Sequence, residues 1–284
     1  MRTAGIIAAF ALRESLRRRV FLVVGLLTVA FLVLYALGTW QLFDSVGQFD
    51  EPIRGVDART VAAATILGLA MFATLFLGTI LAVFLTLGAV RGDAERGLLQ
   101  PILVRPVRRR TVLAGRFAAA AGVCGIYVIV VFVAATVITW AFSDWWPDRL
   151  AVPALQLAAA VAILAALSIG GSVLLASTAN GIAVFMIFGA GLTAGLLGQI
   201  GEALGSDTLD RVSNIVSWAL PFEALYQAAL SALTQETVGF TRLAIDLGPF
   251  GGAESAGPLL WPFAVAYLAA VAAVSAAAFA RRDL

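Results

Sequence analysis

The sequence predicts an all-α membrane protein with six transmembrane helices, and three observations support this fold class. Hydrophobic residues make up 61% of the 284 residues and charged residues only 13%, whereas ordinary soluble domains contain about 45–50% and about 25%. Six long apolar stretches follow one another, and a helix needs about 20 such residues to cross a bilayer. Arginines gather in alternate connections between these stretches, as expected when successive connections lie on opposite sides of a membrane.

The predicted spans contain almost no ionisable side chains. In chain order they cover residues 20–43, 60–90, 112–143, 150–179, 181–201 and 256–280. Apart from Arg116 at the base of the third span, these ranges contain no Asp, Glu, Lys, Arg or His. Ionisable groups at bilayer depth usually mark proton relays and ion pathways. Their absence from the spans argues against proton-coupled transport and against acid–base catalysis within the bilayer.

The distribution of arginine predicts that both termini are cytoplasmic. Five arginines stand in the N-terminal segment 1–19, seven between positions 91 and 116, and two near the C-terminus, whereas the three other connections hold only five. Cytoplasmic loops of membrane proteins collect positive charge. We therefore expect segment 1–19 at the cytoplasmic membrane surface, a cytoplasmic loop over 91–111 and a long external loop over 202–255.

The predicted external loop contains an apolar segment, Val212 to Leu233. Its polar residues argue against a seventh transmembrane crossing. A seventh crossing would also place the C-terminal arginines outside. Pro221 suits the first position of a helix, and apolar residues then recur at helical spacing on one face: Phe222, Leu225, Tyr226, Ala229, Leu230 and Leu233. We predict an external helix that is amphipathic or re-entrant and that begins with Pro221, Phe222 and Glu223.

Missing residue types exclude several kinds of enzyme. All 19 basic residues are arginine, and the chain contains no Lys and no His. A P-loop or a Schiff-base site needs Lys, and zinc proteases and most proton-shuttling sites need His. The single cysteine, Cys124, lies in an apolar stretch and is interpreted as a small buried hydrophobic residue. We expect this chain to have no catalytic residue and to bind no metal or cofactor, so energy for any work comes from a partner.

The predicted cytoplasmic loop 91–111 combines charge with apolar side chains. Arginines at 108–110 suit a simple stop-transfer signal. That interpretation does not explain the aliphatic residues in the middle of the loop, which are Leu98, Leu99, Ile102, Leu103 and Val104. Such side chains could lie among lipid headgroups, pack under the bundle, or enter a groove on a partner protein. The residues themselves leave these three alternatives open.

Small residues in the fifth span predict a close helix contact. Gly191 and Gly195 form a small-xxx-small pair, which Gly198 and Gly201 continue, and such pairs let another helix approach closely. Packing inside one subunit is preferred here over a dimer contact. Hydroxyl side chains in the second and fourth spans could line a transport route, but bonding to their own helix backbone is the preferred interpretation; they are Thr65, Thr74, Thr79, Thr86, Ser168 and Ser172.

Six short segments carry a family resemblance. They are Glu95-Arg96-Gly97-Leu98-Leu99, Arg105-Pro106-Val107-Arg108-Arg109, Val112-Leu113-Ala114-Gly115-Arg116, Asn180-Gly181, Leu220-Pro221-Phe222-Glu223-Ala224 and Phe279-Ala280-Arg281-Arg282-Asp283-Leu284. In these segments the chain resembles the ABC-2 type permeases, which are membrane subunits of ATP-binding-cassette (ABC) transporters, and most nearly their NosY-like branch. Arg108 stands where that family usually has Ser, and Arg116 where it usually has Lys.

The resemblance implies a permease subunit of the prokaryotic cell (inner) membrane that pairs with a second copy of itself, as a homodimer. It would bind two copies of a separately encoded ABC ATPase, and ATP and Mg would be bound there. The second cytoplasmic loop would be the coupling helix. Its ATPase-coupling residues would be Glu95, Arg96, Gly97, Leu98, Leu99, Arg105, Pro106 and Arg109. Arg105 and Arg109 could equally pair with acids on the ATPase or with lipid phosphates.

Other functions remain compatible with the sequence. The chain could be a membrane scaffold that transmits ATPase motion to an extracytoplasmic partner protein without moving a solute. It could also be an ATP-independent channel or insertion factor. Nothing indicates nucleic-acid binding, because the arginines follow the membrane topology. No charged pocket, metal cluster or aromatic cage at membrane depth points to a particular substrate.

Overall fold

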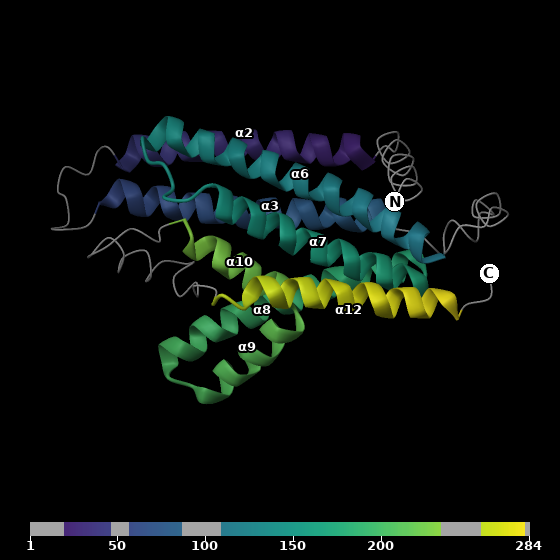
Figure 1. The fold of residues 1–284 in the computed structure, drawn as a ribbon. Coiled ribbons are helices and arrows are strands. Elements are labelled where there is room, and N and C mark those ends of the chain that lie inside the picture. The colour runs from purple at the N-terminus through teal and green to yellow at the C-terminus, as the bar shows by residue number, and fades with distance from the viewer. Residues whose placement is uncertain (1–19, 47–56, 87–108, 234–256, 282–284) are drawn as a thin grey trace.

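The computed structural model describes residues 20–46, 57–86, 109–233 and 257–281, which form eight helices and no strand within these ranges (Figure 1). Six helices are long and apolar enough to cross a membrane. They are α2 (Val20–Val46), α3 (Ala58–Thr86), α6 (Arg109–Ser143), α7 (Ala151–Leu174), α8 (Ser177–Leu204) and α12 (Leu260–Ala280). Two shorter helices, α9 (Asp207–Ala219) and α10 (Pro221–Ser231), follow α8. The prediction of an all-α protein with six spans is confirmed.

The boundary between the fourth and fifth spans differs from the prediction, which separated them at Asn180. Helix α7 already ends at Leu174, Leu175 takes an extended conformation, and α8 begins at Ser177. Asn180 therefore lies in the first turn of α8, and its amide Nδ2 donates a hydrogen bond to the carbonyl oxygen of Ser168 at 2.9 Å. Asn180, which the prediction left between the two spans, belongs instead to the contact between α7 and α8.

The ends of the long helices lie at two opposite ends of the bundle (Figure 1). The start of α2, the end of α3, the start of α6 and the end of α12 lie together at one end, which we call the inner end. The end of α2 and the starts of α3 and α7 lie at the opposite, outer end. Thr86 and Arg109, which flank segment 87–108, thus lie at the same end as Val20 and Arg281. The described residues that flank the arginine-rich segments therefore lie at one end, as the predicted topology requires.

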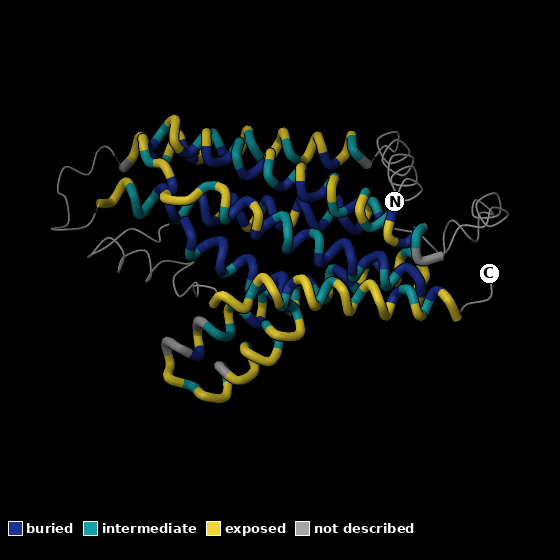
Figure 2. Tube along the Cα trace, viewed as in Figure 1, coloured by how far each residue is buried: buried dark blue, intermediate teal, exposed yellow. Residues whose placement is uncertain are grey.

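Helices α3 and α7 form the centre of the bundle, whereas α2 and α12 lie at its periphery (Figure 2). Helix α7 packs against α3, α6, α10 and α12. Helix α2 is attached to α6 through two hydroxyl pairs, Thr28 with Tyr127 at 2.6 Å and Tyr35 with Thr139 at 2.5 Å. The rest of its surface exposes leucines and valines. So large an apolar surface is typical of a membrane or protein contact.

Hydroxyl groups inside the bundle bond mainly to their own helices. Thr74, Thr79 and Thr86 of α3 each donate to the carbonyl oxygen four residues earlier at 2.7 Å. Ser172 of α7 donates to the carbonyl oxygen of Ile169 at 2.7 Å. These bonds satisfy the hydroxyls without water or ligand, as the preferred interpretation of the sequence predicts.

A sharp turn at Gly205 reverses the chain after α8. Gly205 has a φ of +63°, a left-handed conformation that glycine adopts without steric cost. The backbone N–H of Ser206 then donates to the carbonyl oxygen of Gly201 at 2.9 Å, as in a Schellman helix end. Helix α9 consequently returns along α8 and packs against it. Figure 1 shows this helix pair leaning away from the rest of the bundle.

Candidate functional site: the re-entrant helix and the inner polar cluster

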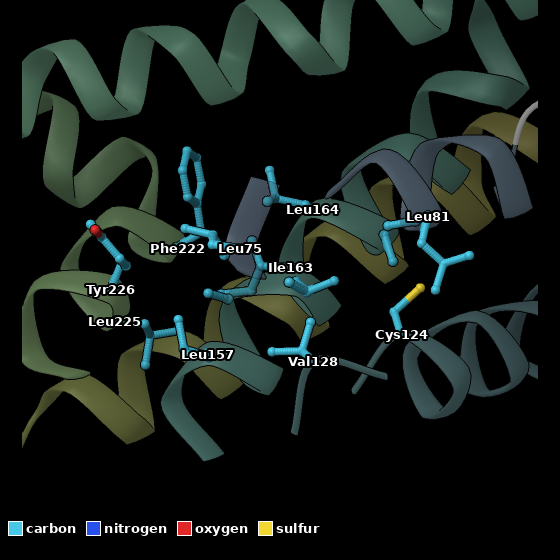
Figure 3. Close-up of a cluster of buried hydrophobic side chains, with 14 of the residues drawn as sticks. Leu75, Leu81, Cys124, Val128, Leu157, Ile163, Leu164, Phe222, Leu225 and Tyr226 are labelled. Atoms are coloured by element: carbon cyan, nitrogen blue, oxygen red, sulfur yellow. The ribbon is translucent and has the colours of Figure 1, made fainter. Parts of the chain in front are cut away.

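Helix α10 begins deep in the bundle. The ring of Phe222 is fully buried and stacks on Phe188 of α8 with a centroid separation of 6.0 Å. Phe188 in turn lies 6.0 Å from the ring of Phe76 in α3. Both partners come from the central turns of their long helices, so the first turn of α10 lies level with the middle of the bundle. Figure 3 shows Phe222 in the same buried cluster as Leu75 of α3 and Leu164 of α7.

The other end of α10 lies at the outer end of the bundle. There the backbone N–H of Asp148, just before α7, donates to the carbonyl oxygen of Leu233 at 3.3 Å. With 11 residues, α10 is about 16 Å long, about half of the roughly 30 Å hydrocarbon core. The chain therefore descends along α9 to mid-depth and returns to the same end along α10. Of the two predicted alternatives, the structure has the re-entrant one.

The apolar face predicted for this helix is fully buried. Its six members are Phe222, Leu225, Tyr226, Ala229, Leu230 and Leu233. Burial extends beyond that face, because Glu223 and Ala228 are also inaccessible. Helix α10 packs on α7 most extensively and also contacts α8, α9 and α12. It is therefore enclosed by the bundle, unlike an amphipathic helix that lies on a membrane surface.

The glycines of α8 make room for the two short helices of the same subunit. A β-carbon on Gly191 would stand 2.4 Å from Cζ of Phe222, and one on Gly195 would stand 2.1 Å from Oε1 of Glu223. A β-carbon on Gly198 would stand 2.5 Å from the hydroxyl oxygen of Ser213 in α9. The close contact predicted from the small-xxx-small spacing is thus found inside one subunit, as preferred.

Glu223 places a carboxyl group inside the bundle. It is 2% exposed, and its Oε1 accepts a hydrogen bond from Nε2 of Gln227 at 2.8 Å. Burial raises the pKa of Glu223 to about 7, against the smaller lowering effect of the Gln227 bond. Residue types placed Glu223 in the external helix, but neither its burial nor its contact with Gly195 follows from the pattern. The six predicted spans carry no acid, yet α10 brings one into the middle of the bundle.

A second polar group of residues, which we call the inner polar cluster, consists of Thr86, Ser168 and Asn180. The hydroxyl groups of Thr86 and Ser168 are hydrogen-bonded to each other at 2.5 Å, and Nδ2 of Asn180 donates to the carbonyl oxygen of Ser168. All three are buried, and Oδ1 of Asn180 occupies the space that a β-carbon on Gly171 would need. The cluster connects α3, α7 and α8 near the inner end. Thr86 is also the last described residue before segment 87–108.

The predicted ATPase-coupling residues fall mostly outside the described ranges. These are Glu95, Arg96, Gly97, Leu98, Leu99, Arg105 and Pro106. Arg109 is the first residue of α6, but its side chain is not described. Their role stays a prediction. In the part of the chain that the structure describes, no three His, Cys, Asp or Glu side chains come together in a way that could hold a metal ion.

Comparison with known protein families decides the class of this membrane protein. The sequence profile of the family described as ABC-2 family transporter protein matches residues 6–284, almost the whole chain. The chain belongs to the ABC-2 transporter family. Among curated proteins, no sequence matches it. Family membership and the six apolar helices together identify an ABC-2 permease that crosses the membrane several times. The match does not reach the NosY-like branch, which stays a prediction.

Membership in the ABC-2 family also bears on energy supply. Membrane components of this family are generally non-catalytic and work with an ABC ATPase. The absence of Lys from the whole sequence agrees with this, since a P-loop in this chain would lack its lysine.

Proposed function

We propose that this chain is the membrane-spanning permease subunit of an ABC transporter, and that it moves a substrate with energy from ATP hydrolysed on a separate nucleotide-binding subunit. Family membership over residues 6–284 is the observation that carries the proposal. We also propose that two copies form the working unit, and that segment 91–111 binds the ATPase at the cytoplasmic face.

The bundle offers a route by which motion of that segment could reach the centre of the molecule. Helices α3 and α6 flank the segment in the sequence and pack against each other. Thr86 at the end of α3 is bonded to Ser168 of the central helix α7. A displacement of the segment would therefore act on α3, α6 and α7 as rigid elements, which is a common way for bundles to switch. Helix α10 packs most extensively on α7, so the same displacement would reach the re-entrant helix.

The test is reconstitution of the full chain with the ABC ATPase that copurifies with it. Proteoliposomes should show ATP-dependent flux of candidate solutes that stops when the ATPase carries an inactive Walker lysine. ATP-dependent release of a bound extracytoplasmic protein, without any flux, would contradict transport and support the scaffold function instead. Absence of any copurifying ABC ATPase would contradict both.

Variants of the coupling segment make the proposal specific. Charge reversal in Arg105→Glu combined with Arg109→Glu should weaken ATPase binding and abolish ATP-driven flux while membrane insertion is unchanged, because like charges would replace opposite ones at the contact. Glu95→Ala should reduce coupling in the same direction. Arg108→Ser introduces the residue usual in the family and serves as the matched control, which should retain coupling. Normal flux and unchanged ATPase affinity in the double variant would refute the assignment.

A further inference from the structure

We propose that Glu223 is an exchangeable proton-binding site of the re-entrant helix, and that the bound proton holds α10 against α8. The proposal concerns this chain alone and does not depend on the transport function. Three buried polar atoms on one face of α10 carry the argument.

In the described part of the chain, two acceptor oxygens at the site have no hydrogen-bond donor within reach, and the Tyr226 hydroxyl, itself a donor, has no partner there. Glu223 is 2% exposed and has one partner, Nε2 of Gln227, at its Oε1. Oε2 of Glu223, Oε1 of Gln227 and the hydroxyl of Tyr226 are all buried without a hydrogen-bond partner among the described residues. An ionised carboxylate and an amide oxygen can only accept. The smallest ligand that supplies the missing donor is a proton on Oε2.

Among the described residues, no counter-charge for an ionised Glu223 stands on α7, α8 or α12, three of the helices that pack against α10. Helices α7 and α12 contain no Asp, Glu or Arg, and the ionisable side chains of α12 are limited to Tyr267. Helix α8 contains only Glu202, seven residues beyond the contact at Gly195. An unpaired carboxylate in such surroundings is costly, whereas the neutral acid is not.

Within the part of the chain that the structure describes, the remaining charged groups near α10 are those of α9 and of the residues just before α7. Arg211 of α9 is exposed, and Asp207 and Asp210 of that helix lie toward its start, far from the turn into α10. Asp148 and Arg149 precede α7 next to Leu233, at the opposite end of α10 from Glu223. On α10 itself, Tyr226 is the ionisable neighbour, and burial raises its pKa. Tyr226 therefore stays a neutral hydroxyl and cannot compensate a carboxylate.

Close contact with α8 makes the position of α10 sensitive to this proton. Oε1 of Glu223 and Nε2 of Gln227 lie against the backbone at Gly195, where a β-carbon would stand 2.1 Å and 3.0 Å from them. Between Oε1 and the Gly195 backbone there is no room for water that would hydrate an ionised carboxylate while α10 stays against α8. Loss of the proton therefore favours separation of the two helices.

The chain is well suited to a direct test, since it contains no His and few other groups titrate between about pH 5 and 8. We would record infrared difference spectra of the full chain in phosphatidylcholine vesicles between pH 5 and 9 and follow the carbonyl band of protonated carboxyl groups. The wild type should lose one protonated carboxyl per chain in this range. Glu223→Gln should lack that transition, and Asp207→Asn, which removes an exposed acid, should retain it.

A second variant separates proton binding from a merely structural role. Gln227→Leu removes the donor that stabilises the carboxylate, so the transition should move to higher pH. Identical spectra for the wild type and Glu223→Gln across the range would overturn the proposal. A protonated band of Glu223 that persists to pH 9 would overturn exchange. A transition that Gln227→Leu leaves in place would overturn the assigned partner.

Discussion

Single glycines in α8 determine whether the re-entrant helix fits. Gly191→Ala should destabilise the protein because the new β-carbon would overlap the buried ring of Phe222, and overpacking of this kind costs about 1–3 kcal/mol. Gly189→Ala is the matched control, since a β-carbon there meets nothing within 4 Å. Thermal unfolding of both variants in detergent would show the difference. Equal midpoints would mean that Phe222 does not pack on Gly191.

The buried carboxyl group of Glu223 predicts how stability depends on pH. Its folded-state pKa is raised to about 7 from an ordinary value of 4.5, so the folded protein holds this proton more tightly than the unfolded chain. The midpoint of thermal unfolding should therefore fall as pH rises from about 4.5 to about 7 and level off above that range. In Glu223→Gln this dependence should disappear. A wild-type midpoint that stays level through this window would show that the carboxyl is ionised in the folded state.

At the level of residues, the sequence predicted which side chains of α10 share a face, but not that the whole helix start is buried. Helical spacing identified Phe222, Leu225 and Tyr226 as one buried face, because periodicity reports which side chains share a direction. It could not reveal that Glu223, one position further round the helix, is buried as well. The burial of Glu223 depends on close contact with α8. The spacing of Gly191 and Gly195 predicted a close contact but did not show which helix makes it.

Among the helices, the contact between α3 and α7 at the inner polar cluster yields another prediction. Ser168→Ala removes the hydroxyl that bonds to Thr86 between α7 and α3, and hydrogen bonds between membrane helices are worth roughly 0.5–2 kcal/mol. We expect a small loss of stability and a larger loss of ATP-driven flux, with ATPase binding unchanged. Thr193→Ala is the control, because that hydroxyl bonds only to its own helix, at Gly189. Equal flux in both variants would exclude the cluster from coupling.

Long elements were predictable, and of the two short helices only α10 was predicted. Six apolar stretches predicted six helices because a continuous uncharged run of this length has few other stable forms in lipid. The helix α9 was missed although its sequence carries a signal, since Leu209, Val212 and Val216 recur at helical spacing. That spacing does not show that the chain turns at Gly205 and packs α9 on α8. The break near Leu175 was placed at Asn180 because residues 150–201 form one uncharged run.

For the whole molecule, the topology can be tested with cysteine labelling. The native Cys124 is fully buried, so the unmodified chain should stay unlabelled. In intact cells, an impermeant maleimide should label Asp207→Cys, and it should label Arg281→Cys only after the membrane is opened. Both positions are exposed. Labelling of both from outside would imply an odd number of crossings, and the reverse pattern would imply an inverted molecule.

The re-entrant pair has a consequence for the surrounding lipid. Helices α9 and α10 both occupy the outer half of the bundle and neither reaches the inner half. The described helices therefore take up more area in the outer half than in the inner half, so this part of the protein widens toward the outer side. Neighbouring lipids must adapt to that asymmetry, so any displacement of α10 would change the lateral pressure on the outer monolayer as well as the shape of the protein.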